Sequence, residues 1–173
     1  MTTASAAHLN QVDLGAVGAL VEKIRQRPSA AQTTWSAEVR WTGAFRSEAA
    51  VRKFAPIASD EPRGMGGTDS APNPVEQLLA ALGNCLAVGY AINASAAGIT
   101  IRTLRIDVDG DLDVHALFGL ADGHPGFSAI RVAVHLDSDA DEDAVAELHA
   151  KVAATSPVGQ TLSQAIPVEI GPA

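Results

Sequence analysis

The residue with the clearest chemical potential in this sequence is Cys85, the only cysteine among 173 residues. It lies within an apolar stretch, residues 78–92, that also contains Gly83 and Asn84. A cysteine in an apolar helix is often inert core filling. A reactive cysteine needs a cation or another polarising group, because the thiolate is the nucleophilic form. Residue type alone leaves both interpretations open, and a reactive Cys85 requires an arginine from another segment.

Other motifs that carry chemistry are incomplete. The five histidines are scattered, without a pair four residues apart or a neighbouring cysteine. The acidic runs at 107–113 and 137–143 lack the Gly and Glu of a calcium loop, and we interpret them as a solvated hairpin and a helix start. The Gly-rich run at 64–67 is not a phosphate-binding loop, and the sequence has no Gly-x-Ser-x-Gly elbow. We therefore expect no metal and no tightly bound cofactor.

The composition is that of a globular domain with a sizeable core, since 47% of the residues are hydrophobic and 18% are charged. The formal charge of −8 argues against a nucleic-acid partner, because phosphate binding needs clustered Lys and Arg. The N-terminal residues lack the basic and apolar regions of a signal peptide, so we expect a cytoplasmic protein. The apolar stretch is shorter than the ~20 residues of a membrane span. It predicts a buried helix and no membrane partner.

Hydrophobic periodicity and turn residues predict an α+β fold with the order α-β-β-α-β-β-β-α-β. Asn73, Pro74 and Glu76 form a helix start, and Gly98 is a helix stop. The dipeptide Asp109-Gly110 favours a hairpin turn. The expected helices cover about residues 10–26, 74–97 and 137–154, with a short turn at 158–163; the expected strands cover 33–41, 49–54, 100–108, 112–118, 127–136 and 166–170, and a loop covers 57–74.

Several motifs around Cys85 and farther along the chain resemble one known family. They are Asp60-Glu61-Pro62, Gly66-Gly67-Thr68-Asp69, Ala71-Pro72-Asn73-Pro74-Val75-Glu76, Leu78-Leu79-Ala80-Ala81-Leu82-Gly83-Asn84-Cys85-Leu86, Gly126-Phe127, Ser156-Pro157-Val158, Thr161-Leu162 and Pro167-Val168. Together they are similar to the signature of the OsmC/Ohr family of osmotically inducible and organic-hydroperoxide-resistance proteins, over about residues 33–170. The resemblance implies that residues 1–30 are an N-terminal helical extension and residues 31–173 the OsmC-like domain.

The resemblance also implies the fold and the site. The fold would be α+β and OsmC-like, with antiparallel sheets wrapped around central helices in an intertwined homodimer and active sites at the interface. Cys85 takes the position of the peroxidatic cysteine. Arg46, in the loop after the first strand, takes the position of the arginine that holds the thiolate, with Arg40 and Arg52 as alternatives.

Two positions depart from the family pattern. The carboxylate that orients the arginine aligns with Val75, and the candidate here is Glu76, offset by one residue. On an ideal helix Glu76 lies about 180° from Cys85, so it could instead cap the helix. The second, resolving cysteine of the family is replaced by Ser156, and a Ser-Pro pair is also a common way to end a helix.

The resemblance therefore implies a thiol-dependent peroxidase that reduces organic hydroperoxides through a single cysteine, Cys85, in oxidative or osmotic stress defence. Without a second cysteine, oxidised Cys85 needs an external thiol reductant such as a lipoyl group or a thioredoxin-type dithiol. The alternative is a non-catalytic dimer of the same fold that senses oxidant through Cys85 or binds a small apolar ligand. An inert Cys85 is the third interpretation.

Overall fold

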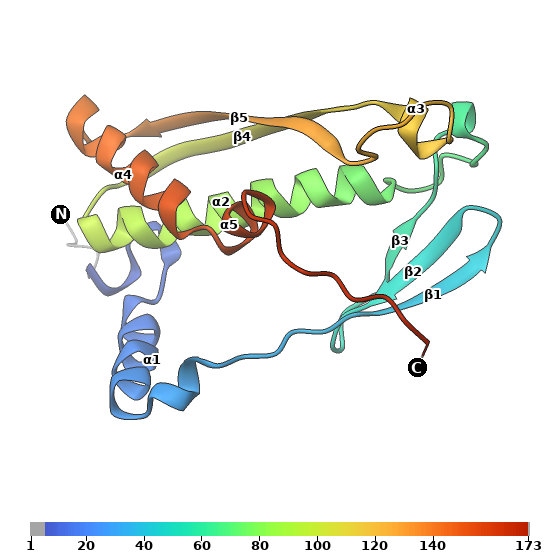
Figure 1. Ribbon diagram of the computed structural model, residues 1–173. Helices are drawn as coiled ribbons and strands as arrows, with labels where there is room; N and C mark the ends of the chain where they lie inside the picture. Colours follow the sequence, from blue (N-terminus) through green and yellow to red (C-terminus); the bar gives the residue numbers. More distant parts are fainter. Residues whose placement is uncertain (1–5, 173) are drawn as a thin grey trace. The chain divides into compact units, whose positions relative to one another are not determined.

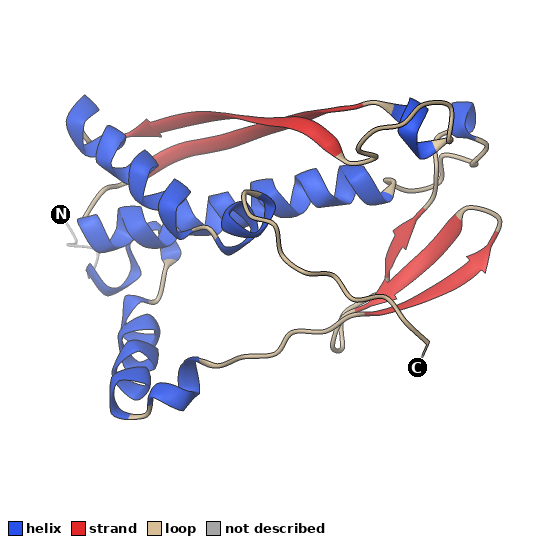
Figure 2. Ribbon diagram, viewed as in Figure 1, coloured by secondary structure: helices blue, strands red, loops and turns tan. Residues whose placement is uncertain are grey.

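The computed structural model describes residues 6–172, which form helices and antiparallel strands in two compact units. One unit consists of residues 18–78, and the other of the described residues up to 17 together with those from 79 onward. The elements (Figures 1 and 2) are η1 Ala6–Gln11, α1 Leu14–Gln26, η2 Pro28–Ala31, β1 Glu38–Gly43, β2 Arg46–Ala50, β3 Ile57–Ser59, η3 Arg63–Met65, α2 Pro74–Ala97, β4 Ile101–Leu112, α3 Val114–Leu117, β5 Phe127–Ser138, α4 Glu142–Thr155 and α5 Pro157–Leu162. The predicted α+β class is confirmed.

The unit of residues 18–78 contains the antiparallel sheet β1-β2-β3. The tight turn between β1 and β2 uses Gly43 and Ala44, with positive φ values of 112° and 50°. The predicted hairpin is confirmed, but its second strand begins at Arg46 rather than at residue 49. The prediction of a loop over 57–74 is wrong in part, because this range contains β3 and η3. A strand of three residues is too short to show an alternating pattern.

The predicted first helix is confirmed, but α1 begins at Leu14 rather than at about residue 10. Asn10 and Gln11 adopt left-handed φ values of 53° and 62°, which a helix cannot include. The Asn10 side chain anchors this segment: Nδ2 donates to Ser95 Oγ at 3.0 Å and to the Ile99 carbonyl at 2.9 Å, and Oδ1 accepts from the Ile101 N–H at 2.9 Å. These bonds join the N-terminal segment to the connection between α2 and β4.

Strands β4 and β5 form an antiparallel pair with 12 residues in each strand. The predicted turn at Asp109-Gly110 is wrong, because both residues pair with β5 inside the ladder. A Cβ at position 110 would come 2.7 Å from Phe127 Cδ1, so this glycine makes room for the ring. The predicted separate strand at 112–118 is also wrong: β4 ends at Leu112, and Asp113 caps α3 by accepting from the His115 N–H at 2.9 Å.

The alternating acids of β4 face basic side chains of β5. Arg131 forms ion pairs with Asp109 and Asp111, and His135 Nε2 lies 2.9 Å from Asp107. The hydrogen bond from Arg131 holds the pKa of Asp111 below its usual range. Exposed pairs contribute little stability individually. The two pairs of Arg131 do relieve like-charge repulsion along β4, and the acidic run is a solvated strand rather than a hairpin.

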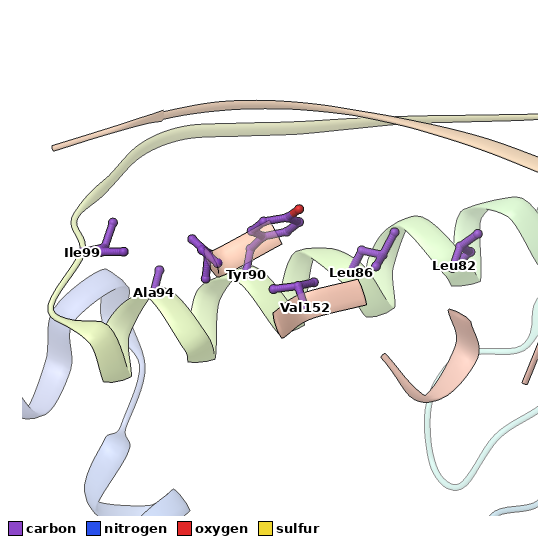
Figure 3. Close-up of a cluster of buried hydrophobic side chains, with 7 residues drawn as sticks. Leu82, Leu86, Tyr90, Ala94, Ile99 and Val152 are labelled. Atoms are coloured by element: carbon purple, nitrogen blue, oxygen red, sulfur yellow. The ribbon is translucent and has the colours of Figure 1, made fainter. Parts of the chain in front are cut away.

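Helix α2 confirms the predicted extent of the central helix and ends at Ala97, directly before Gly98, whose φ is 76°. Its buried side chains recur every four residues, as Leu82, Leu86, Tyr90 and Ala94. They pack with Ile99 and with Val152 of α4 (Figure 3). Leu148 of α4 belongs to the same buried cluster. Away from this packed face, Val88 of α2 is 68% exposed. By length and composition alone α2 could cross a membrane, but its packed face is that of a helix in a globular core.

The helix predicted over about residues 137–154 is confirmed as α4, which begins after its cap residue Asp141. Residues 137 and 138, expected at its start, belong to β5. The predicted short turn is α5. The predicted strand at 166–170 is wrong: the described residues there form no strand, and Ile170 is 95% exposed. Apolar alternation becomes a strand only where another strand supplies hydrogen-bond partners.

Candidate functional site

Cys85 lies on α2 directly before the buried Leu86, and its side chain is partly exposed. Adjacent helical residues are about 100° apart around the axis, so the sulfur lies at the edge of the buried face. A thiol in this position combines contact with the packed interior and access for a reagent. An inert core cysteine lacks that access.

The side chain of Ser156 contacts Cys85, with 3.3 Å between Ser156 Oγ and Cys85 Sγ. Ser156 is 3% exposed, and it ends α4 and caps α5. Its Oγ accepts a hydrogen bond from the Gly159 N–H at 3.1 Å. The structure thus brings together Cys85 and the position at which the resemblance expects a resolving cysteine.

Two glycines permit this contact. A Cβ at Gly89 would come 3.1 Å from Val152 Cγ1, so α2 and α4 approach each other closely about one turn beyond Cys85. A Cβ at Gly159 would come 3.1 Å from Ser156 Oγ. Because the two helices pack closely, the end of α4 lies next to Cys85. Gly159 of α5 leaves room for the Ser156 hydroxyl.

A groove of about 440 Å³ lies beside Cys85. Its walls come from α2 and from the connection between α4 and α5, and they are mostly apolar. The lining residues are Asn84, Cys85, Val88, Gly89, Ile92, Asn93, Thr155, Ser156 and Pro157. The sulfur is therefore accessible to a small molecule with an apolar body.

The three candidate arginines lie in the unit of residues 18–78, whereas Cys85 belongs to the other unit. Arg40 Nε lies 2.7 Å from Glu38 Oε1, and the Arg52 guanidinium stacks over the Phe54 ring at 4.7 Å from its centroid. Arg46, the first residue of β2, has an exposed side chain and forms no ion pair within residues 6–172. These local partners favour Arg46 over the two alternatives. The assignment of an arginine to Cys85 stays a prediction.

Glu76 forms a capping box with Asn73 at the start of α2. Asn73 Oδ1 accepts from the Glu76 N–H at 3.0 Å, and Glu76 Oε2 accepts from the Asn73 N–H at 2.8 Å. The predicted helix start is confirmed, and the Glu76 carboxylate satisfies a backbone donor there. A catalytic role for Glu76 stays a prediction.

Asp60 organises the loop before α2. The sequence marks this residue only within the motif Asp60-Glu61-Pro62 and does not predict its role. Asp60 is 1% exposed. Its carboxylate accepts from the backbone and hydroxyl of both Thr68 and Ser70 and from the Glu61 N–H. These bonds, above all that from the Thr68 hydroxyl, hold the pKa of Asp60 far below its usual range. Gly67 is required in the same loop, because a Cβ there would come 1.8 Å from the Glu61 carbonyl oxygen.

The acids near this loop are occupied by protein donors rather than arranged for a metal. Asp60 has five hydrogen bonds, and Glu61 Oε2 accepts from Asn73 Nδ2 at 3.1 Å. Over the part of the chain that the structure describes, no group of three or more His, Cys, Asp and Glu side chains could hold a metal ion.

Tyr90 and His149 form a polar contact that the sequence did not reveal. Tyr90 Oη lies 2.6 Å from His149 Nδ1, and the rings meet edge to face with centroids 5.5 Å apart. Burial raises the pKa of Tyr90, which keeps its hydroxyl protonated. A protonated hydroxyl and an imidazole share one hydrogen bond, whose direction is set by the imidazole tautomer. No local spacing signals this pair, because it joins α2 to α4.

Comparison with solved structures identifies the same fold in several proteins. An OsmC-like protein from Mycoplasma pneumoniae has 22% identity and a TM-score of 0.68, with 76% of this chain and 89% of that chain covered. An organic hydroperoxide resistance protein OsmC from Legionella pneumophila has 17% identity and a TM-score of 0.56, with coverage of 76% and 91%. A proposed organic hydroperoxide resistance protein from Vibrio cholerae, with captopril in one of the active sites, has 13% identity, a TM-score of 0.53 and coverage of 76% and 87%.

No curated protein matches the sequence. The sequence pattern of the family described as OsmC-like protein matches residues 67–171, more than half of the chain. This match includes Cys85, Ser156 and the whole of α2. It confirms the resemblance found in the sequence motifs, and this chain belongs to the OsmC-like protein family.

Proposed function

We propose that this protein is a thiol-dependent peroxidase that reduces organic hydroperoxides through Cys85, in oxidative or osmotic stress defence in the cytoplasm. The observation that carries the proposal is a partly exposed thiol beside an apolar groove and in contact with a hydroxyl. The names of structural neighbours, which include hydroperoxide resistance proteins, lend further support.

In the first step the Cys85 thiolate attacks the distal oxygen of the hydroperoxide. A sulfur–oxygen bond forms, the peroxide bond breaks, and the leaving alkoxide takes up a proton and departs as an alcohol. Sulfur loses two electrons and becomes a sulfenic acid. Arg46 would hold the thiolate and neutralise charge on the leaving oxygen through charge-assisted hydrogen bonds.

The second half of the reaction requires thiols from outside the chain, since the sequence contains one cysteine. A first external thiol attacks the sulfenic acid, releases water and forms a mixed disulfide with Cys85. A second thiol then attacks the mixed disulfide, frees Cys85 and leaves the reductant as a disulfide. A dithiol such as a lipoyl group or thioredoxin supplies both thiols in one molecule.

Two further parts of the proposal concern the substrate and the assembly. The apolar groove beside Cys85 suits an organic tail better than hydrogen peroxide.

A homodimer would cover apolar side chains that are exposed in the single chain, such as Val39, Trp41 and Val88.

Mass spectrometry of Cys85 after treatment with stoichiometric cumene hydroperoxide tests the proposal. We expect Cys85 to gain one oxygen and to return to the thiol when dihydrolipoamide or reduced thioredoxin is added. The Cys85→Ser variant should neither gain the oxygen nor consume peroxide. Absence of both Cys85 oxidation and peroxide consumption with every dithiol would overturn the proposal.

A redox sensor of the same fold is the second candidate, and the single cysteine favours it. In that case Cys85 is oxidised to the sulfenic acid but is not reduced catalytically by any dithiol. A third outcome, an apolar molecule that co-purifies with an unreactive Cys85, would indicate a ligand-binding protein.

A further inference from the structure

We propose that Ser156 donates a hydrogen bond to the Cys85 thiolate. The residue at the position of the family's resolving cysteine would then activate the reduced sulfur instead of resolving the oxidised one. The importance of this contact for turnover rests on the proposed function. The contact itself can be tested without any peroxide.

The other partner of Ser156 Oγ leaves the hydroxyl proton free for the Cys85 thiolate, which can only accept. A serine hydroxyl has one proton and two lone pairs. One lone pair accepts from the Gly159 N–H at 3.1 Å. The proton remains available for Cys85 Sγ at 3.3 Å. Acceptance from the Gly159 N–H also polarises the hydroxyl and makes it a better donor.

Because Ser156 is buried, the strength of its hydrogen bond to Cys85 depends on whether Cys85 is a thiol or a thiolate. Ser156 is 3% exposed, so water cannot easily take the place of a missing partner. When Cys85 is a thiolate, it has no proton of its own and accepts from the hydroxyl with a full negative charge. When Cys85 is a thiol, the same hydroxyl meets only a weak, neutral sulfur acceptor. The contact therefore stabilises the thiolate more than the thiol.

A hydroxyl at this position also has a consequence after oxidation. Ser156 cannot form a disulfide, so the Cys85 sulfenic acid persists until an external thiol reaches it through the groove. With serine rather than cysteine at position 156, the two halves of the reaction, oxidation of Cys85 and its reduction, depend on different molecules. The chain promotes attack on the hydroperoxide, and the reductant completes the cycle.

The test measures the rate of Cys85 alkylation by iodoacetamide across pH, together with thiolate absorbance near 240 nm, in the full chain without peroxide. Ser156→Ala and Ser156→Gly remove the donor; glycine is tolerated at a helix N-cap much better than alanine, so the second variant should keep α5 folded. We expect both to move the midpoint of the alkylation profile upward by about one pH unit and to slow alkylation at pH 7 by up to about tenfold.

Two control variants separate this effect from loss of stability. Ser156→Thr keeps a hydroxyl and should retain the wild-type midpoint. Asp141→Ala removes the cap of α4, whose carboxylate accepts from the Ala144 N–H at 2.9 Å, and should lower thermal stability without moving the midpoint. An unchanged midpoint in folded Ser156→Ala or Ser156→Gly would overturn the inference. If the midpoint shifts but the protein reduces no hydroperoxide, the inference about Ser156 holds and the proposed function is rejected.

Discussion

Gly89 of α2 and Val152 of α4 are in direct contact, and a methyl group on Gly89 would come 3.1 Å from Val152 Cγ1. Val152 is 1% exposed, so it has little room to move away. Ser156 follows Val152 by one helical turn and contacts Cys85, which precedes Gly89 by one turn. The spacing of the two helices at this pair therefore sets the distance between the thiol and the hydroxyl.

Replacement of Gly89 by Ala should push α4 away from α2 by a few tenths of an ångström. Overpacking costs about 1–3 kcal/mol, and the higher helix propensity of Ala returns about 1 kcal/mol, so we expect a net loss of about 1 kcal/mol in the free energy of unfolding. Urea denaturation measures this loss. Gly18→Ala is the matched control, since a Cβ there meets no atom within 4 Å, and it should stabilise the protein slightly. Equal effects of the two substitutions would contradict the close packing at Gly89.

Asp60 should make the stability of the protein depend on pH. Its pKa is lowered in the folded state, so its contribution is present above the unfolded value of about 3.9 and is lost as pH falls below it. Asp60→Asn should lower the thermal midpoint by several degrees at pH 7, and the difference from wild type should shrink as pH approaches 3. Asp69→Asn, in the same loop but exposed, should change little at either pH. A difference for Asp60→Asn that stayed constant between pH 7 and pH 3 would argue against this interpretation.

Tyr90→Phe removes the hydroxyl that is hydrogen-bonded to His149 Nδ1. We expect a loss of about 1 kcal/mol in the free energy of unfolding, because a partly buried ring nitrogen loses its hydrogen-bond partner. A double-mutant cycle with His149→Ala measures the coupling, which should be at least 0.5 kcal/mol for a real contact. Additive effects at neutral pH would show that the two side chains do not interact.

Asn10 should anchor the N-terminal segment through its side chain. Asn10→Gly keeps the left-handed φ accessible and removes three hydrogen bonds, so we expect a loss of about 1–3 kcal/mol. Asn10→Ala should cost about 1 kcal/mol more, because Ala also strains at positive φ. Hydrogen exchange should show faster exchange at the Ile101 N–H in both variants. Wild-type protection of this amide in Asn10→Gly would contradict the anchoring role.

Several elements could be predicted from local sequence because their causes are local. Asn73, Pro74 and Glu76 place the start of α2 through capping, and Gly98 ends it with a positive φ. The alternation of β5 and the acidic start of α4 are likewise properties of neighbouring residues.

Other elements could not be predicted because their causes lie elsewhere in the chain. Asp109-Gly110 has the composition of a turn, yet Arg131 pairs with the acid and the Phe127 ring occupies the space above the glycine. The apolar run at 166–170 lacks a strand partner among the described residues. The hydrogen bonds of Asp60 and the contact of Tyr90 with His149 follow no spacing rule.

The sequence by itself determined which chemistry is available to this protein: one thiol, no second cysteine to resolve it, and the motifs of the OsmC-like family. Only the tertiary structure decided that the hydroxyl of Ser156 meets the sulfur of Cys85. The two residues are 71 positions apart. Their contact depends on how closely α4 packs against α2, which is set by side-chain volume at Gly89 and Val152 rather than by any residue of the motif.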